Sequence, residues 1–154
     1  SMKTHHNLLK FIIVFILSAF LILSTHAQEN ISWQELAEVE WQDRYDTLTG
    51  FTLIDGIYSD HLKSLDSTEV YISGYVIPFD ALGFSFALSR TSFASCFFCG
   101  QAGPETVLSL RIKPNSIEPS RQKNTKIKFK GLFRVHESNE NGFHYELLNA
   151  EEVN

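Results

Sequence analysis

The sequence predicts a mostly β protein built around a small five-stranded barrel, preceded by a short N-terminal helix and a lead-in strand. From Glu69 onward, apolar residues recur at every second position, which is typical of strands with one buried face. The runs are short and are separated by stretches rich in proline, glycine and polar residues, which indicate turns and loops. A β-sandwich is the alternative that the same pattern allows.

The first 27 residues have the layout of a secretory signal peptide. Lys3 and Lys10 give a basic start, an apolar run extends from Phe11 to Leu23, and small residues precede Ala27. The run is shorter than the roughly 20 apolar residues that cross a bilayer. We therefore expect cleavage after Ala27, export to the periplasm, and no transmembrane segment in the mature chain.

Residues 28–66 are expected to form the helix and the lead-in segment. Ser32 and Glu35 have capping-box spacing, which predicts one or two helical turns after Ser32. The stretch from Glu40 to Asp55 indicates an extended strand, broken near Gly50. Ser59 can cap a short helix that ends near Leu65. Two tryptophans are expected to pack on the main body: Trp33 and Trp41.

Residues 67–154 are expected to supply the five barrel strands. Pro78 and Pro114 end the first and third strands, and the polar stretch from Lys113 to Thr125 predicts a loop. Gly74 and Gly131 lie in mid-strand, where a coiled sheet bends or another backbone comes close. Five strands in this order fit a barrel of the oligonucleotide/oligosaccharide-binding (OB) type. The apolar faces of the first four strands are Val70, Ile72, Gly74 and Val76; Phe84, Phe86 and Leu88; Leu108, Leu110 and Ile112; and Ile127, Phe129, Gly131, Phe133 and Val135. The stretch Phe143 to Val153 supplies the fifth strand.

The charge balance argues against nucleic acid as a partner. The formal charge of the chain is -5, and all 18 acidic residues follow Ala27. Loss of Lys3 and Lys10 with the signal peptide takes the mature chain to -7. Nucleic acid needs a positive surface. The lysines at positions 126, 128 and 130 alternate as the solvated face of one strand.

Cys96 and Cys99 are the only two cysteines, and they form the one chemistry-bearing cluster. Two thiols at this spacing can bind a soft metal, form a small disulfide or exchange electrons. Gly100 follows where a c-type haem site needs His. Thioredoxin-like chemistry is disfavoured because Gly100, Gly103 and Pro104 predict no helix after the pair. A disulfide closing so short a loop contributes about 2 kcal/mol, so stability alone is a poor reason for the motif.

A metal site needs ligands beyond the two thiolates, because zinc prefers four neighbours and Cu(I) two or three. The end of the fourth strand carries His136 and the start of the fifth carries His144, so one hairpin could present both as ligands. His61 is expected to be a surface helix residue. Alternatively, two chains could each contribute a Cys pair to a four-thiolate ion, which would make the protein a homodimer.

The competing hypothesis is a non-catalytic envelope module that binds a protein partner. In that case Cys96 and Cys99 form a disulfide, and Phe97 or Phe98 between them is an exposed contact. Either way the sequence does not indicate an enzyme, because it offers no specific carboxylate pair, Ser-His-Asp set or phosphate loop.

Four stretches carry a resemblance to a known family: Ile31–Trp33 with Leu36, Val70–Pro78, Phe86–Arg90 and, above all, CFFCGQAGPE from Cys96 to Glu105. The chain resembles a family of short exported bacterial proteins of unknown function, common in Bacteroidetes-type bacteria. The resemblance covers nearly all of the mature chain and brings no known activity.

More distantly, the chain resembles exported lipoproteins with a Cys-x-His pair, followed by prolines, in the same loop. In that comparison Cys96 keeps its place, and the second group is Cys99 instead of His. An exchange between Cys and His suits metal ligation and cannot serve a disulfide. This resemblance therefore implies zinc or copper binding at the pair. The chain lacks a lipidated cysteine, so membrane anchoring is not implied.

Overall fold

A computed structural model describes residues 29–78, 86–92, 102–114, 126–138 and 142–153. The expected signal peptide, both cysteines and the phenylalanines between them lie outside these residues. The barrel strands are β4 (Glu69–Pro78), β5 (Phe86–Ser89), β6 (Val107–Ile112), β7 (Lys126–Val135) and β8 (Tyr145–Val153).

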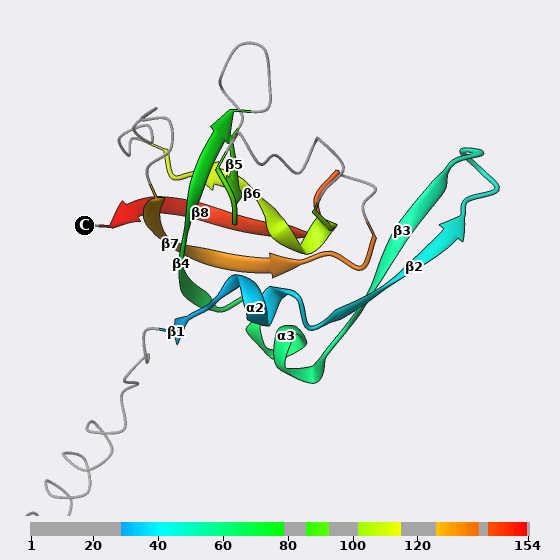
Figure 1. The fold of residues 1–154 in the computed structure, drawn as a ribbon, viewed down its shortest axis with the longest axis horizontal. Helices are drawn as coiled ribbons and strands as arrows, with labels where there is room; N and C mark the ends of the chain where they lie inside the picture. The colour runs from blue at the N-terminus through cyan, green and yellow to red at the C-terminus, as the bar shows by residue number, and fades with distance from the viewer. Residues whose placement is uncertain (1–28, 79–85, 93–101, 115–125, 139–141, 154) are drawn as a thin grey trace, which may run out of the picture.

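These strands close into the predicted five-stranded barrel. They pair in the order β4-β5-β6-β8-β7, and β7 pairs back onto β4. The β6–β8 pair is parallel and the other pairs are antiparallel, so the sheet is mixed. Figure 1 shows β7 and β8 crossing the barrel side by side. The OB-like barrel is thus confirmed.

Alternation along β4 and β7 builds much of the core, as the sequence predicts, while β5 and the first four residues of β6 are buried on both faces. In β4, Val70 and Ile72 are fully buried, while Glu69, Tyr71 and Ser73 on the other face are exposed or half-buried. Phe129 and Phe133 of β7 and Tyr145 of β8 fill the barrel, and the rings of Phe133 and Tyr145 stack at 5.7 Å. Burial of these large apolar side chains is the main stabilising contribution.

The two mid-strand glycines lie where neighbouring strands come close. A Cβ on Gly74 would be 2.7 Å from the Ser89 carbonyl oxygen, and one on Gly131 would be 2.7 Å from the Leu148 carbonyl oxygen. Real Cβ atoms do not approach a backbone so closely. The register of β7 on β8 also shifts between Lys130 and Leu132, so the sheet bends at this glycine.

Two short helices cover one end of the barrel. In α2 (Trp33–Leu36), the predicted capping box is present, with Ser32 and Glu35 each satisfying the other's backbone N–H. Ser59 caps α3 (Asp60–Leu65) as predicted. Trp33 is buried and donates to the Ser73 carbonyl oxygen at 2.8 Å. Ahead of α2, the two-residue strand β1 (Glu29–Asn30) adds in parallel to β4.

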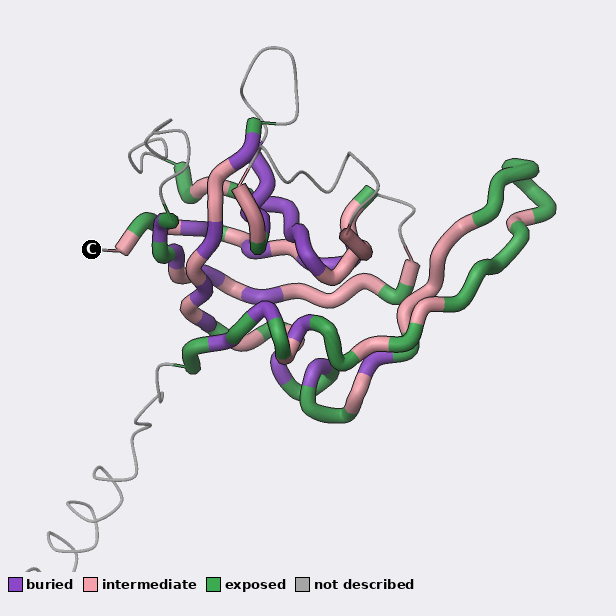
Figure 2. Tube along the Cα trace, in the orientation of Figure 1, coloured by how far each residue is buried: buried purple, intermediate pink, exposed green. Residues whose placement is uncertain are grey.

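The predicted lead-in strand is a hairpin rather than one strand. Its halves are β2 (Val39–Tyr45) and β3 (Thr52–Tyr58), paired antiparallel along their whole length. The expected break is a reversal, in which Gly50 has a φ of +75°. Figure 1 shows the hairpin running away from the barrel, and Figure 2 shows its exposure rising towards the tip.

Ahead of β6, where the sequence predicts no helix, the chain makes one 3₁₀ turn, η3 (Pro104–Thr106). It has proline in its first turn. Among the described residues, no helix has the length and apolar character needed to cross a membrane.

Candidate functional site

His144 lies at the base of the hairpin, immediately before β8, and is 2% exposed. The Trp41 ring from β2 covers it, with a centroid separation of 4.5 Å. Tyr58 at the end of β3 reaches it from a second side. Gly56 makes room for that tyrosine, because a Cβ there would overlap the Tyr58 ring. The hairpin therefore buries an imidazole that strand position alone would leave in solvent.

Hydrogen bonds determine which ring nitrogen of His144 carries the proton. The Tyr58 hydroxyl donates to the His136 carbonyl oxygen at 2.7 Å, so its oxygen can only accept from His144. The Nδ1 atom of His144 lies 3.0 Å from that hydroxyl oxygen and 3.3 Å from the same carbonyl oxygen. Both partners are acceptors here, so Nδ1 bears the hydrogen. The lone pair of the neutral ring is on Nε2.

Electrostatics favour the neutral ring. Burial lowers the pKa of His144 below its usual range, because a desolvated imidazolium is penalised. Burial likewise raises the pKa of the Tyr58 hydroxyl, which keeps it protonated as a donor. A neutral imidazole with a fixed tautomer is the form that binds metal ions.

The Nε2 atom of His144 is buried and has no hydrogen-bond partner among the described residues. A buried acceptor without a partner costs about 1–3 kcal/mol, so native structures rarely keep one. In metal sites, a ligating His usually donates its other N–H to a carbonyl or similar acceptor, as Nδ1 does here. The arrangement fits an imidazole held ready to donate its Nε2 lone pair.

The described residues that follow the cysteines contact a side chain that covers His144. The Trp41 indole N–H donates to the Glu105 carboxylate at 2.9 Å, and the same indole ring covers His144. The Arg90 N–H donates to the Thr106 carbonyl oxygen at 2.9 Å, so the loop between them starts and ends at one place. Cys99 is six residues before Glu105, a span of at most about 20 Å of extended chain.

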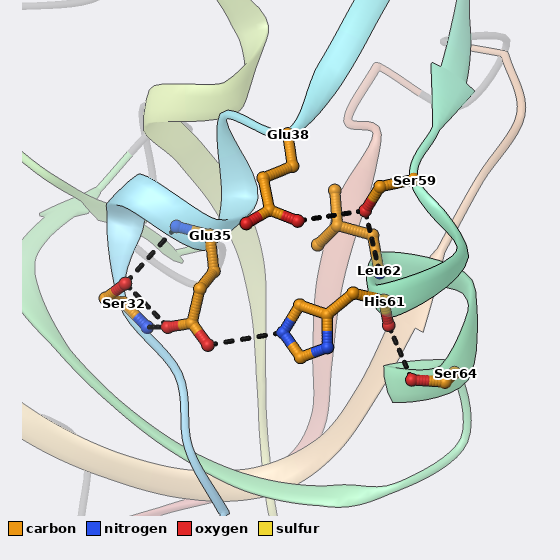
Figure 3. A network of polar contacts seen from close by, with 7 residues as sticks. All are labelled: Ser32, Glu35, Glu38, Ser59, His61, Leu62 and Ser64. Carbon is orange, nitrogen blue, oxygen red and sulfur yellow. Dashed lines mark hydrogen bonds and ion pairs between the residues drawn. The ribbon is translucent and has the colours of Figure 1, made fainter.

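Within the described residues, the two remaining histidines make different contacts. His136 is the backbone partner of His144, donating its N–H to the His144 carbonyl oxygen at 2.8 Å, but the Nε2 atom of its ring lies 3.4 Å from a Glu146 carboxylate oxygen. His61 lies on exposed α3, as predicted, and its ring reaches Glu35 of α2 at 3.3 Å, a contact that ties the two helices together (Figure 3).

The predicted set of metal ligands remains a prediction, because the structure does not describe the two cysteines. Cys96, Cys99, Phe97 and Phe98 fall outside the described residues. Within the described ranges, no three His, Cys, Asp or Glu side chains gather as a metal-binding group.

Sequence reasoning missed two side chains that contact His144, Trp41 and Tyr58, and the Glu105 carboxylate that binds Trp41. Trp41 and Tyr58 carry no local signal for this role, because these contacts join residues far apart in the chain. Trp41 and Glu105 are 64 residues apart, and Tyr58 and His144 are 86 apart. Glu105 lies within the motif CFFCGQAGPE, and its nearness to the cysteines was the one available signal.

Comparison with known proteins gives a similarity in structure and none in sequence. No protein-family model and no curated protein sequence matches the chain. A crystal structure of a DUF3299 family protein from Pseudomonas aeruginosa PAO1 is similar, with a TM-score of 0.47 and 12% sequence identity. The similarity covers 83% of this chain and 97% of that chain.

Proposed function

We propose that this protein is an exported, periplasmic metal-binding or metal-handling module. The Cys96 and Cys99 thiolates and the Nε2 atom of His144 together bind one zinc or copper ion. Thiolates and imidazoles are the ligands that both metals prefer in proteins. Three such ligands satisfy Cu(I), and zinc would take a fourth group or a water molecule.

The observation that carries the proposal is the buried, unpartnered Nε2 atom of His144. Its position supports the same reading, because the loop end at Glu105 is bonded to the Trp41 side chain that covers the imidazole. His136 supplies the carbonyl oxygen that orients the ring, and as a ligand it would have to leave Glu146. We therefore rank His144 ahead of His136.

Metal content tests the proposal. Protein purified under reducing conditions without chelator should hold up to one equivalent of zinc or copper. The double variant Cys96→Ser/Cys99→Ser should lose it, because it removes both soft ligands. His144→Gln should bind more weakly. The control is His61→Gln, which removes a histidine bonded to Glu35 and should keep the metal.

A cobalt(II)-loaded sample gives a second measurement, because thiolate ligation produces an absorption band that a nitrogen- or oxygen-bound ion lacks. The band should vanish in the double Cys variant. Protein that holds no metal and has no free thiols would contradict the proposal. It would favour the envelope interaction module, in which Phe97 and Phe98 present a disulfide-shaped contact.

A further inference from the structure

The β2–β3 hairpin has an open edge and an apolar tip. In the part of the chain that the structure describes, β2 pairs with β3 and with no other strand. Beyond its base the hairpin is exposed, with Tyr45 at 65%, Leu48 at 94% and Phe51 at 70%. A two-stranded hairpin is at best marginally stable in water. An arm of this kind is stabilised when something adds to its edge.

The outer edge of β2 has its backbone groups aligned for pairing. The Asp46 N–H donates to Phe51 and the Glu38 carbonyl accepts from Ser59, so the even-numbered residues of β2 bond to β3. Because these bonds alternate along an antiparallel ladder, the odd-numbered residues direct N–H and C=O outward. The strand contains neither proline nor lysine, two devices that block edge pairing in natural sheets.

We propose that β2 pairs antiparallel with β2 of a second copy of this chain, about a two-fold axis at Gln42. The two hairpins then form one four-stranded sheet. In this register, the backbone N–H and C=O groups of Trp41 in each copy form hydrogen bonds with those of Asp43 in the other. These are odd-numbered residues, whose backbone groups point away from β3. It places Tyr45 of one copy opposite Val39 of the other, so each apolar tip lies towards the barrel of its neighbour.

Strand overlap and charge together favour this register over its neighbours. The hairpin from Glu38 to Tyr58 has five carboxylates and one arginine, so two copies repel unless the arginine is well placed. An axis at Asp43 would set that carboxylate against its own copy, and an axis at Arg44 would do the same to the guanidinium. An axis at Trp41 would pair only residues 39–43 and would move the contact of Arg44 to Glu38, outside the strand. An axis at Gln42 pairs the whole of β2 and sets Glu40 opposite Arg44 at both ends, with Glu38 opposite Asp46 just beyond the strand. Arg44 also holds Asp55 at 2.6 Å, and its five N–H donors allow both contacts.

Charge exchange tests the register. All variants carry Cys96→Ser/Cys99→Ser, so a dimer formed through shared metal or thiols is removed and the result is independent of the proposed function. In sedimentation velocity, the otherwise unaltered protein should show a concentration-dependent dimer. Glu40→Arg alone or Arg44→Glu alone should weaken it at least about tenfold, because each creates two like-charge contacts. The combined exchange should restore it.

A cross-link tests the axis without relying on charge. Opposite non-hydrogen-bonded residues have Cα atoms about 4.5 Å apart, within the range of a disulfide. Gln42→Cys should therefore form a covalent dimer on mild oxidation, and Thr52→Cys on the other strand should not. Three outcomes would each overturn the proposal: a monomer at all soluble concentrations, a dimer insensitive to the charge exchange, or a monomer whose tip binds lipid vesicles.

Discussion

The Tyr58 hydroxyl has a single proton, and where that proton points decides the chemistry of a neighbouring ring. Because the hydroxyl donates to the His136 carbonyl oxygen, it must accept from His144, and the free lone pair is left on Nε2. Tyr58 thereby acts as a positioning residue for the candidate ligand, in the way that outer groups orient ligating histidines in metal sites.

Removing this hydroxyl should loosen the imidazole. We expect Tyr58→Phe to weaken metal binding about 10- to 100-fold, the range seen when a group behind a ligand is lost. The unfolding free energy should fall by about 1–3 kcal/mol, since the His136 carbonyl loses a partner. Competition with a coloured chelator measures the affinity. Tyr45→Phe, at the exposed tip, is the control, and equal affinities in the two variants would contradict a positioning role.

A second residue links stability to pH. Asp66 accepts hydrogen bonds from the Val135 N–H at 2.9 Å and from Arg134 Nε at 3.1 Å. Burial acts to raise the pKa of Asp66, but these hydrogen bonds outweigh it, so the pKa lies below its ordinary value. Since the folded state holds the carboxylate more strongly than the unfolded chain does, the stabilisation is present above about pH 4 and is lost as the pH falls further.

Asp66→Asn should remove this acid sensitivity. At pH 7 the variant should be about 1 kcal/mol less stable, a modest figure because the carboxylate is partly exposed to solvent. The difference in unfolding free energy between the variant and the unaltered protein should disappear as the pH is lowered towards 3. Urea denaturation at a series of pH values measures it. Glu152→Gln, on the exposed part of β8, serves as the control, and a gap that widens in acid would refute the assignment.

At the scale of elements, β7 depends on having no side chain at one position. A Cβ on Gly131 would meet the Leu148 carbonyl oxygen at 2.7 Å and Leu147 Cγ at 2.8 Å, where the register shifts. We expect Gly131→Ala to destabilise the barrel by about 1–3 kcal/mol, the cost of forcing packed groups apart. Chemical denaturation should show this, while Lys128→Ala on the outer face of β7 should change stability by about 0.5 kcal/mol or less.

At the scale of the molecule, the barrel could be predicted and the site could not. β4 and β7 each have one buried face, so their period is visible in the sequence, whereas β5 and most of β6 are buried on both faces. The β2–β3 hairpin has no comparable buried face, because β2 projects from the barrel and most of its residues are exposed. His144 was placed correctly at the last strand, but its burial depends on Trp41 and Tyr58 of that hairpin. Contacts of this range leave no periodic pattern.

Metal should stabilise the whole domain through mass action. At a free zinc concentration 100 times the dissociation constant, the gain is about 2.7 kcal/mol. The double variant Cys96→Ser/Cys99→Ser should show no gain, and without metal under reducing conditions it should match the unaltered protein within about 0.5 kcal/mol. Thermal unfolding with and without zinc measures both. Equal stabilisation of the two proteins would place the metal elsewhere.

Closure of the barrel through β4 and β7 also has a consequence for how fast the chain reaches its native state. The pairing joins segments far apart in sequence, and near it Arg134 contacts Asp66, 68 residues away. The parallel β6–β8 pair has no local turn to nucleate it either. In a topology with so many distant contacts, the entropy of closing large loops is lost before the stabilising contacts form. Folding should therefore take milliseconds to seconds rather than microseconds.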